Sequence, residues 1–205
     1  GRLSEAEHAL LAARPLRVRL GHAWEEAALA NNLGLVLRDL GRLDDARTAL
    51  DEALRLRRTM GDTAGEAGSL ANLGVVHDLA GSARSALAAL DRAERIFDAA
   101  HQSAEVLLCR TRRAAAWAHC GDLDRAYAVL ETLDASAAPP RIRAEVALVR
   151  VDVALTRGDD ESATRELGVA EREFEVAADV VGSARAKLVR ARLLHQAGDP
   201  SGARK

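Results

Sequence analysis

The sequence predicts an all-α fold in which helix–turn–helix units stack into a right-handed solenoid. Two features of the composition favour helices: 48% of the 205 residues are hydrophobic, yet only 2% are aromatic. A core with so few rings must be filled by leucine, valine and alanine, and alanine has the highest helix propensity. The third observation is an internal repeat of about forty residues, which is typical of solenoid proteins.

The repeat is clearest as a glycine followed by four variable residues and an alanine. It occurs six times, at glycine spacings of 40, 40, 40, 37 and 40 residues: Gly1, Gly41, Gly81, Gly121, Gly158 and Gly198. Apolar residues stand four and seven positions after the alanine, as Leu50 and Ala53 do after Ala46. Such steps place side chains on one stripe of a helix. Each glycine therefore precedes an amphipathic helix, and it supplies the left-handed backbone that ends the helix before it.

A first helix precedes each glycine. Asn32-Leu33-Gly34 recurs forty residues later as Asn72-Leu73-Gly74. A position without a large side chain allows two helix axes to approach closely. We therefore expect the small residue of the first helix to meet the alanine of the second where the two helices cross. Acidic residues near the start of the second helices suit the free N–H groups and the helix dipole: Asp44, Asp122 and Asp159.

This pattern of small and apolar positions resembles the tetratricopeptide repeat. The resemblance covers essentially the whole chain and is strongest over residues 24–100. The usual repeat has about 34 residues, so the forty-residue version implies longer helices. It is similar to the repeats of kinesin light chain and of bacterial multidomain regulators (antibiotic-regulatory, STAND-type or CHAT-associated). The phrase over residues 54–62, followed by Gly65-Glu66-Ala67, resembles those bacterial arrays. HEAT and armadillo repeats are the second alternative, because they have a similar length but do not explain the glycine–alanine pairing.

The predicted organisation has three parts. Residues 1–133 form an array with a partial first repeat and three repeats, residues 134–140 form a proline-containing loop, and residues 141–205 continue the array with one repeat and a truncated one. Pro139-Pro140 falls where the period shortens, and proline ends a helix. Gly1 would be the turn of a repeat whose first helix is absent, so we expect a region of a longer protein.

Composition and motifs argue against several classes of function. The net charge of -2 gives no footprint for nucleic acid, and no stretch is apolar enough to cross a membrane. The sequence has no phosphate-binding loop, nucleophile turn or metal-ligand spacing, so we expect no cofactor, no metal and no enzyme activity. Cys109 and Cys120 lie about 16 Å apart in one predicted helix, too far for a disulfide. We expect both to be buried hydrophobic residues in a reducing, cytoplasmic setting.

In tetratricopeptide folds the first helices line a concave groove, and the repeat register identifies the side chains that face it. An asparagine amide both donates and accepts hydrogen bonds, so it can hold an extended peptide by its backbone. Members of the family that bind peptides often use asparagine in this way; the alternative is that these asparagines hold neighbouring helices together. The candidate binding residues are Asn31, Asn32, Leu35, Arg38, Asn72, Val75, Thr111, His119 and Arg192. The same register also includes Ala71, Leu148, Asp152, Leu188 and His195.

Arginine recurs at one position of three successive first helices, as Arg113, Arg150 and Arg190. One interpretation is a basic ladder that binds an acidic partner through bidentate bonds to carboxylates. We favour pairing between repeats with the plentiful Glu and Asp residues, or a solvated face, because surface pairs are common and weak.

The predicted function is recognition of a protein or peptide segment in the concave groove. The chain would act as a scaffold or sensor region of a larger bacterial regulatory protein, and the partner would be another protein or another domain of the same chain. Two alternatives stay open. One is structural self-association into a homo-oligomer, and the other is a role as the sensing arm of a caspase-like (CHAT) protease.

Overall fold

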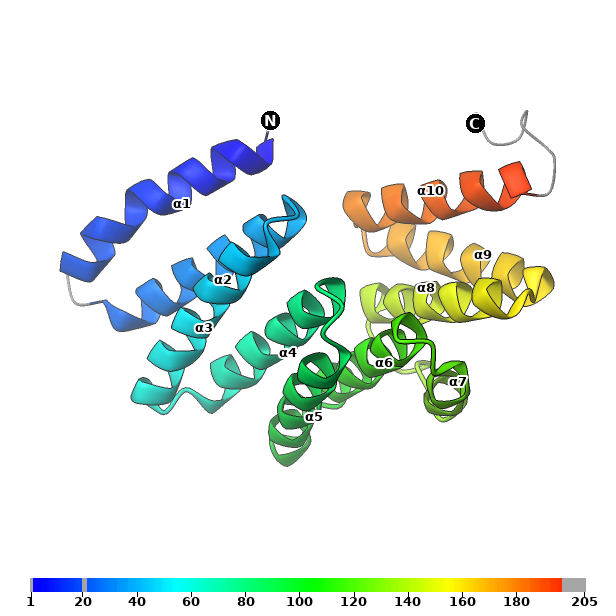
Figure 1. Cartoon of the computed structure of the whole chain (residues 1–205), viewed down its shortest axis with the longest axis horizontal. Coiled ribbons are helices and arrows are strands. Elements are labelled where there is room, and N and C mark those ends of the chain that lie inside the picture. The colour runs from blue at the N-terminus through cyan, green and yellow to red at the C-terminus, as the bar shows by residue number, and fades with distance from the viewer. Residues whose placement is uncertain (1, 20–21, 197–205) are drawn as a thin grey trace. The chain divides into compact units, whose positions relative to one another are not determined.

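The computed structural model describes residues 2–19 and 22–196, and its regular elements are helices (Figure 1). No strand occurs in this part of the chain, so the predicted all-α class is confirmed. Gly1, Gly198 and the side chain of His195 lie outside the described residues. In chain order the helices are α1 (Arg2–Arg19), α2 (Ala23–Asp39), α3 (Leu43–Met60), α4 (Thr63–Leu79), α5 (Ala83–Ala99), α6 (Ser103–His119), α7 (Leu123–Glu131), α8 (Pro140–Arg157), α9 (Asp160–Val176) and α10 (Val180–Gln196).

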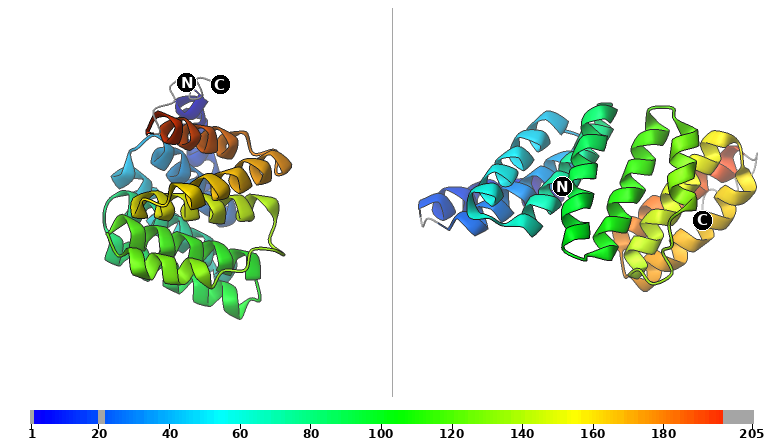
Figure 2. Two further views of the ribbon diagram at one scale, coloured as in Figure 1. Left: turned by 90° about the vertical axis from the view of Figure 1, so that its right-hand side faces the viewer. Right: turned by 90° about the horizontal axis from the view of Figure 1, so that it is seen from below.

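The chain divides into two compact units, and the division falls within α6. Unit 1 comprises Gly1–Cys109 and unit 2 comprises Arg110–Lys205. In unit 1, each helix from α1 to α4 packs against the helix that follows it, and the first helices α2 and α4 also touch each other directly. In unit 2, α7, α8, α9 and α10 pack in the same consecutive order (Figure 2). Each unit is therefore a stack of helical hairpins, which is the solenoid arrangement that the repeat predicts. Within residues 2–19 and 22–196, none of the helices has the length and apolar character needed to span a bilayer.

The alanines of the repeat lie where the two helices of a hairpin cross. All four in the middle of the chain are 0% exposed: Ala46, Ala86, Ala126 and Ala163. Across the crossing in unit 1, Gly74 of α4 leaves room for a leucine of α5. A Cβ atom at Gly74 would lie 2.5 Å from Leu90 Cγ and 3.4 Å from the carbonyl oxygen of Ala86. Gly34 has the same relation to Leu50 of α3. The expected meeting of small residues at the crossing is confirmed, with the leucine side chain filling the space.

A second column of side chains packs each second helix against the following first helix. It lies eleven residues after the alanine and is Arg57 in α3 and Phe174 in α9. Arg57 Nη1 donates to the Gly65 carbonyl oxygen at 2.6 Å and to Ser69 Oγ at 2.9 Å. Phe174 is 0% exposed, and a Cβ atom at Gly182 would lie 2.2 Å from its ring. Glycines of the following helix thus admit a large side chain in both units.

The turns within the hairpins use the predicted residues. The described turn glycines all have the left-handed backbone, with φ between 72° and 90°: Gly41, Gly81, Gly121 and Gly158. The acidic residues that follow two of them cap the second helix. Asp122 Oδ1 accepts from the Arg125 backbone N–H at 3.1 Å, and Asp159 Oδ1 accepts from the Ser162 backbone N–H at 3.0 Å. These bonds satisfy N–H groups that have no partner inside the helix.

Helix α7 is short, with nine residues where α3, α5 and α9 have 17 or 18. It ends at Glu131, and Arg150 of α8 donates hydrogen bonds to two carbonyl groups at this end of the helix. Arg150 Nη2 lies 3.3 Å from the Leu130 oxygen and 3.2 Å from the Leu133 oxygen, so a side chain replaces the bonds that a longer helix would make. Helix α8 then begins at Pro140, because a first helical residue needs no N–H donor.

The two cysteines differ from each other. Cys109 of α6 is buried, as expected, with 1% of its surface exposed. Cys120 is exposed in the turn after α6, where its thiol lies 3.2 Å from the Trp117 carbonyl oxygen. The expectation of burial is therefore wrong for Cys120, because α6 ends one residue earlier and the turn faces solvent. Both cysteines are free thiols.

The close packing at Gly74 leads to a stability prediction. In Gly74→Ala the new methyl group would overlap Leu90, and overpacking of this kind lowers the free energy of unfolding by about 1–3 kcal/mol. Gly68→Ala in the same helix is the matched control, because the nearest atom to its Cβ would be Arg57 Nη1 at 3.7 Å. The control is expected to gain up to about 1 kcal/mol from helix propensity. Urea unfolding measures both, and equal changes would contradict the close crossing.

Candidate functional site

A pair of amides joins the first helices of unit 1. Asn72 Nδ2 of α4 donates to Asn31 Oδ1 of α2 at 3.1 Å, and both side chains are half-buried. This hydrogen bond joins α2 to α4, as expected if these asparagines hold neighbouring helices together. The bond uses only part of each amide. The NH2 group of Asn31 and the carbonyl oxygen of Asn72 stay available to a ligand.

Apolar side chains extend this face by one turn along both helices. Leu35 follows on α2 and Val75 follows on α4, and both are partly buried. Arg38, further along α2, forms an ion pair in which its Nη2 lies 2.7 Å from Asp39 Oδ1. Asn32 is exposed on α2. The face thus combines hydrogen-bonding amides with apolar contacts, which is the combination that an extended peptide needs.

Thr111 does not belong to a partner-facing surface. It is buried, with 1% of its surface exposed. The equivalent residues of two other first helices are buried as well, since Ala71 is 4% and Leu148 is 5% exposed. The same register position is half-buried at Asn31 and exposed at Leu188, so burial here depends on the repeat, and the expectation that Thr111 contacts a partner is corrected.

Charged side chains occupy the corresponding face of unit 2. Asp152 of α8 interacts electrostatically with His119 of α6 and with Arg185 and Arg192 of α10. Arg185 also donates from Nη1 to Oε1 of Glu145 on α8 at 3.0 Å. The structure thus brings two predicted residues, His119 and Arg192, around one carboxylate. The other predicted residues lie in unit 1, apart from Thr111.

The environment of Asp152 is unfavourable for its charge. The side chain reaches solvent, but the helices beside it remove part of its hydration, and this raises the pKa of its carboxyl group. The positive charges of His119, Arg185 and Arg192 act in the opposite direction and are weaker. Perturbed carboxylates of this kind are concentrated at functional sites.

Two members of the arginine column hold hairpins together. Arg190 of α10 contacts Glu171 of α9 through two bonds, with its Nε 2.6 Å from Oε1. Arg150 of α8 also donates to carbonyl groups at the end of α7. Its Nη1 lies 3.9 Å from Oε2 of Glu166 on α9. The favoured interpretation, pairing between repeats, is confirmed for Arg190, whereas the ion pair of Arg150 with Glu166 joins the two helices of one hairpin.

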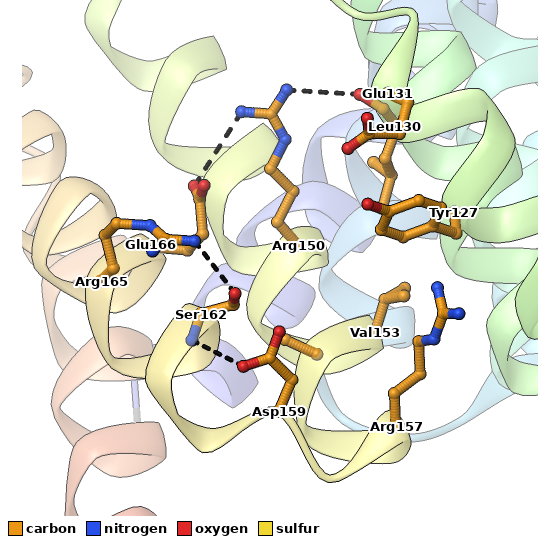
Figure 3. A pocket seen from close by; sticks show the side chains of 11 residues that line it. Tyr127, Leu130, Glu131, Arg150, Val153, Arg157, Asp159, Ser162, Arg165 and Glu166 are labelled. Atoms are coloured by element: carbon orange, nitrogen blue, oxygen red, sulfur yellow. Dashed lines mark hydrogen bonds and ion pairs between the residues drawn. The ribbon is translucent and has the colours of Figure 1, made fainter.

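A pocket of about 650 Å³ opens between α7 and α9 above α8 (Figure 3). Buried Val153 lies at its base. On one side, the guanidinium of Arg157 stacks 4.5 Å from the ring centre of Tyr127. On the other side, Arg165 Nη2 donates to Ser162 Oγ at 2.9 Å. Most of its charged groups thus interact with one another, so the pocket offers an apolar base and a polar rim without a net preference for an anion or a cation.

Across the described ranges, no three or more His, Cys, Asp and Glu side chains are grouped so as to hold a metal ion.

Glu145 and Arg185 were not among the residues predicted from the sequence, although a signal existed. Each stands seven residues before a residue of the charged face, Asp152 and Arg192 respectively. Seven residues are about two helical turns, so each pair shares a helix face.

Comparison with known proteins adds the following. Two family models described as tetratricopeptide repeat match, one over residues 25–99 and the other over residues 107–132 and 184–204. The apo form of the quorum sensor NprR from B. thuringiensis aligns with 97% of this chain, with a TM-score of 0.69 and 13% identity. The chain spans 57% of that NprR chain. BtubC (BKLC) from P. vanneervenii aligns with 98% of this chain and 85% of its own, with a TM-score of 0.63 and 17% identity. No curated protein sequence matches the chain.

The raised pKa of Asp152 predicts a pH-dependent effect on stability. The native state favours the protonated carboxyl more than the unfolded chain does, so ionised Asp152 lowers stability at pH values above the unfolded pKa. We expect Asp152→Asn to raise the melting temperature at pH 7 and to leave it unchanged near pH 3, where the carboxyl is protonated in both states. Circular dichroism at the two pH values measures this.

The control for that experiment is Asp124→Asn. Asp124 is exposed in the first turn of α7, where a negative charge suits the helix dipole, so its removal should not raise the melting temperature at pH 7. A lower melting temperature for Asp152→Asn at pH 7 would show that the neighbouring cations, and not the loss of hydration, dominate at Asp152.

Proposed function

Because the chain belongs to the tetratricopeptide repeat family, we propose that it is a protein-interaction scaffold whose first helices hold an extended segment of a partner. The observation that carries the proposal is the amide pair of unit 1. Asn31 keeps a donor on α2 and Asn72 keeps an acceptor on α4. A peptide group offers the complementary carbonyl and N–H, so a segment lying across the two helices can bond to both.

The packing of unit 1 supports binding with little rearrangement. The helices that carry the amides are fixed by the glycine–leucine contact at Gly34 and Leu50 and by the matching contact at Gly74 and Leu90. A face whose side chains are already ordered loses less conformational entropy when it binds. Leu35 and Val75 add partly buried apolar surface beside the amides, which a partner side chain covers on binding.

We place this scaffold within a larger regulatory protein of bacterial type. The likeness to a quorum sensor from B. thuringiensis supports that context, as does the fact that the chain spans 57% of that sensor. The partner is a segment of another protein or of another domain of the same chain, and the proposal is for binding without catalysis. The free thiols of Cys109 and Cys120 support a reducing, cytoplasmic compartment.

A peptide-display selection tests the proposal without a known partner. Random twelve-residue peptides are selected on the wild-type chain, and the enriched peptides are titrated against an Asn31→Ala, Asn72→Ala double variant. Two lost hydrogen bonds of about 1 kcal/mol each should weaken binding by tenfold or more. Arg55→Ala is the control, because Arg55 is exposed on the second helix α3, and it should bind as the wild type does.

Two outcomes would contradict the proposal. One is a selection that enriches no peptide, and the other is a set of peptides that bind the double variant as tightly as the wild type while circular dichroism shows both chains folded.

Self-association is the second candidate function, because three apolar residues of α10 are exposed: Val180, Val181 and Leu188 are 81%, 72% and 56% exposed. Light scattering on the wild-type chain tests it.

A further inference from the structure

Two helices of unit 2 carry charges of opposite sign in matching places. On α8, Glu145 and Asp152 are seven residues apart, and on α10, Arg185 and Arg192 have the same separation. Because seven residues are about two turns, the carboxylates share one face of α8 and the guanidinium groups share one face of α10. We call the ion pair of Glu145 with Arg185 the first rung and the pair of Asp152 with Arg192 the second rung; Arg185 also acts on Asp152, and more strongly than Arg192 does.

The first rung is closed and the second is open. Arg185 Nη1 lies 3.0 Å from Glu145 Oε1. Asp152 and Arg192 are both exposed and interact electrostatically, yet within the described residues neither side chain forms a hydrogen bond or a close ion pair. An uncommitted carboxylate and an uncommitted guanidinium therefore face solvent on adjacent first helices. The imidazole of His119 of α6 also lies near Asp152 and is a further cation when it is protonated.

We propose that the open rung of Asp152 and Arg192 binds a mixed-charge segment of the partner, with a basic side chain on Asp152 and an acidic side chain on Arg192. The inference rests on the proposed function, because it requires that the first helices hold a partner segment. A purely acidic segment would meet the like charge of Asp152. A purely basic segment would meet Arg192, Arg185 and His119. Like charges brought together disfavour binding, and opposite charges favour it.

The spacing of the helices indicates how far apart the two charges of the segment lie. The ion pair of Glu145 with Arg185 shows that side chains of α8 and α10 meet, so the axes are at least the roughly 8–10 Å apart that is typical of packed helices; an extended chain advances about 3.3–3.6 Å per residue. The acidic and basic side chains are therefore about three residues apart in a segment that crosses α8 and α10. The two charges of a free amino acid are too close together to satisfy this spacing.

The same register position has a different character in unit 1. Leu35 and Val75 stand there, each 117 residues before its counterpart, Asp152 or Arg192. The face of unit 1 thus offers amide and apolar contacts, whereas that of unit 2 offers a pair of opposite charges. The loss of hydration that raises the pKa of Asp152 makes its charge unfavourable for stability. This agrees with a role of the carboxylate in ligand binding.

The test uses fluorescein-labelled nine-residue Gly/Ser peptides and the full chain. One peptide carries Glu and Lys three residues apart, a second carries them in the reverse order, and a third carries Gln at both positions. Fluorescence anisotropy is recorded at a salt concentration of about 20 mM, because screening is weak there. We expect one charged order to bind at least about tenfold more tightly than the Gln peptide.

Variants of the rung identify the site. Asp152→Asn and Arg192→Gln should each abolish most of the preference for the charged peptide, whereas Glu175→Gln, at an exposed position of α9, should leave it unchanged. The double exchange Asp152→Lys with Arg192→Glu should invert the preferred order of Glu and Lys. A role of these residues in folding alone would not produce that inversion.

The outcomes separate this inference from the proposed function. Equal binding of the charged and Gln peptides, or a charge preference that survives both single variants, overturns the inference. If binding of the displayed peptides still depends on Asn31 and Asn72, the proposed function stands without the inference. If the double exchange inverts the preference while the amide variants have no effect, the open rung is a binding site and the role proposed for unit 1 fails.

Discussion

The close crossing of the two helices in each hairpin is the contact on which the remaining structure depends. Ala86 of α5 has no exposed surface, and Leu90, one turn later, fills the space that Gly74 of α4 leaves. Any side chain larger than a methyl group at the alanine would move the helices apart. Because the helices lie so close, the apolar stripe of one hairpin is covered by the next. In unit 1 the first helices α2 and α4 also contact each other, so their outward side chains share one face.

Local signals in the sequence were sufficient for the helices and turns. The positive φ of Gly121 and the cap at Asp122 depend on residues within a few positions of each other, so the pattern that predicts them lies within one window of sequence. The alanine and leucine columns carry the helical period, and the period identifies the buried stripe. These features would be recognised in a single repeat and are strengthened because they recur.

Contacts between repeats were not predictable in the same way. The early end of α7 depends on Arg150, which lies 20 residues after Leu130 and donates to its carbonyl oxygen. The burial of Thr111 depends on how its helix packs within the stack. For the candidate site, the register gave the face on which Asp152, Arg192 and His119 lie but not Arg185, which also acts on the carboxylate. Which side chains meet across two helices depends on their relative position, which no local pattern encodes.

The two units offer chemically different faces built on the same scaffold. In unit 1 the amides of Asn31 and Asn72 bond to each other and keep a donor and an acceptor, which suits recognition of backbone irrespective of side chains. In unit 2 the charges of Asp152 and Arg192 suit recognition of particular side chains. Under the proposed function, the first surface would supply affinity and the second discrimination, since unpaired like charges exclude wrong partners.

The most direct test of the close crossing compares two alanines of one helix. Ala86 and Ala88 both lie in α5, but Ala86 has no exposed surface whereas Ala88 faces solvent. Substitution by valine costs each helix the same small loss of propensity, about 0.6 kcal/mol. Urea unfolding should show that Ala86→Val loses about 1–3 kcal/mol more than Ala88→Val, because only Ala86 has no room for added methyl groups. An equal loss at the two positions would contradict the account.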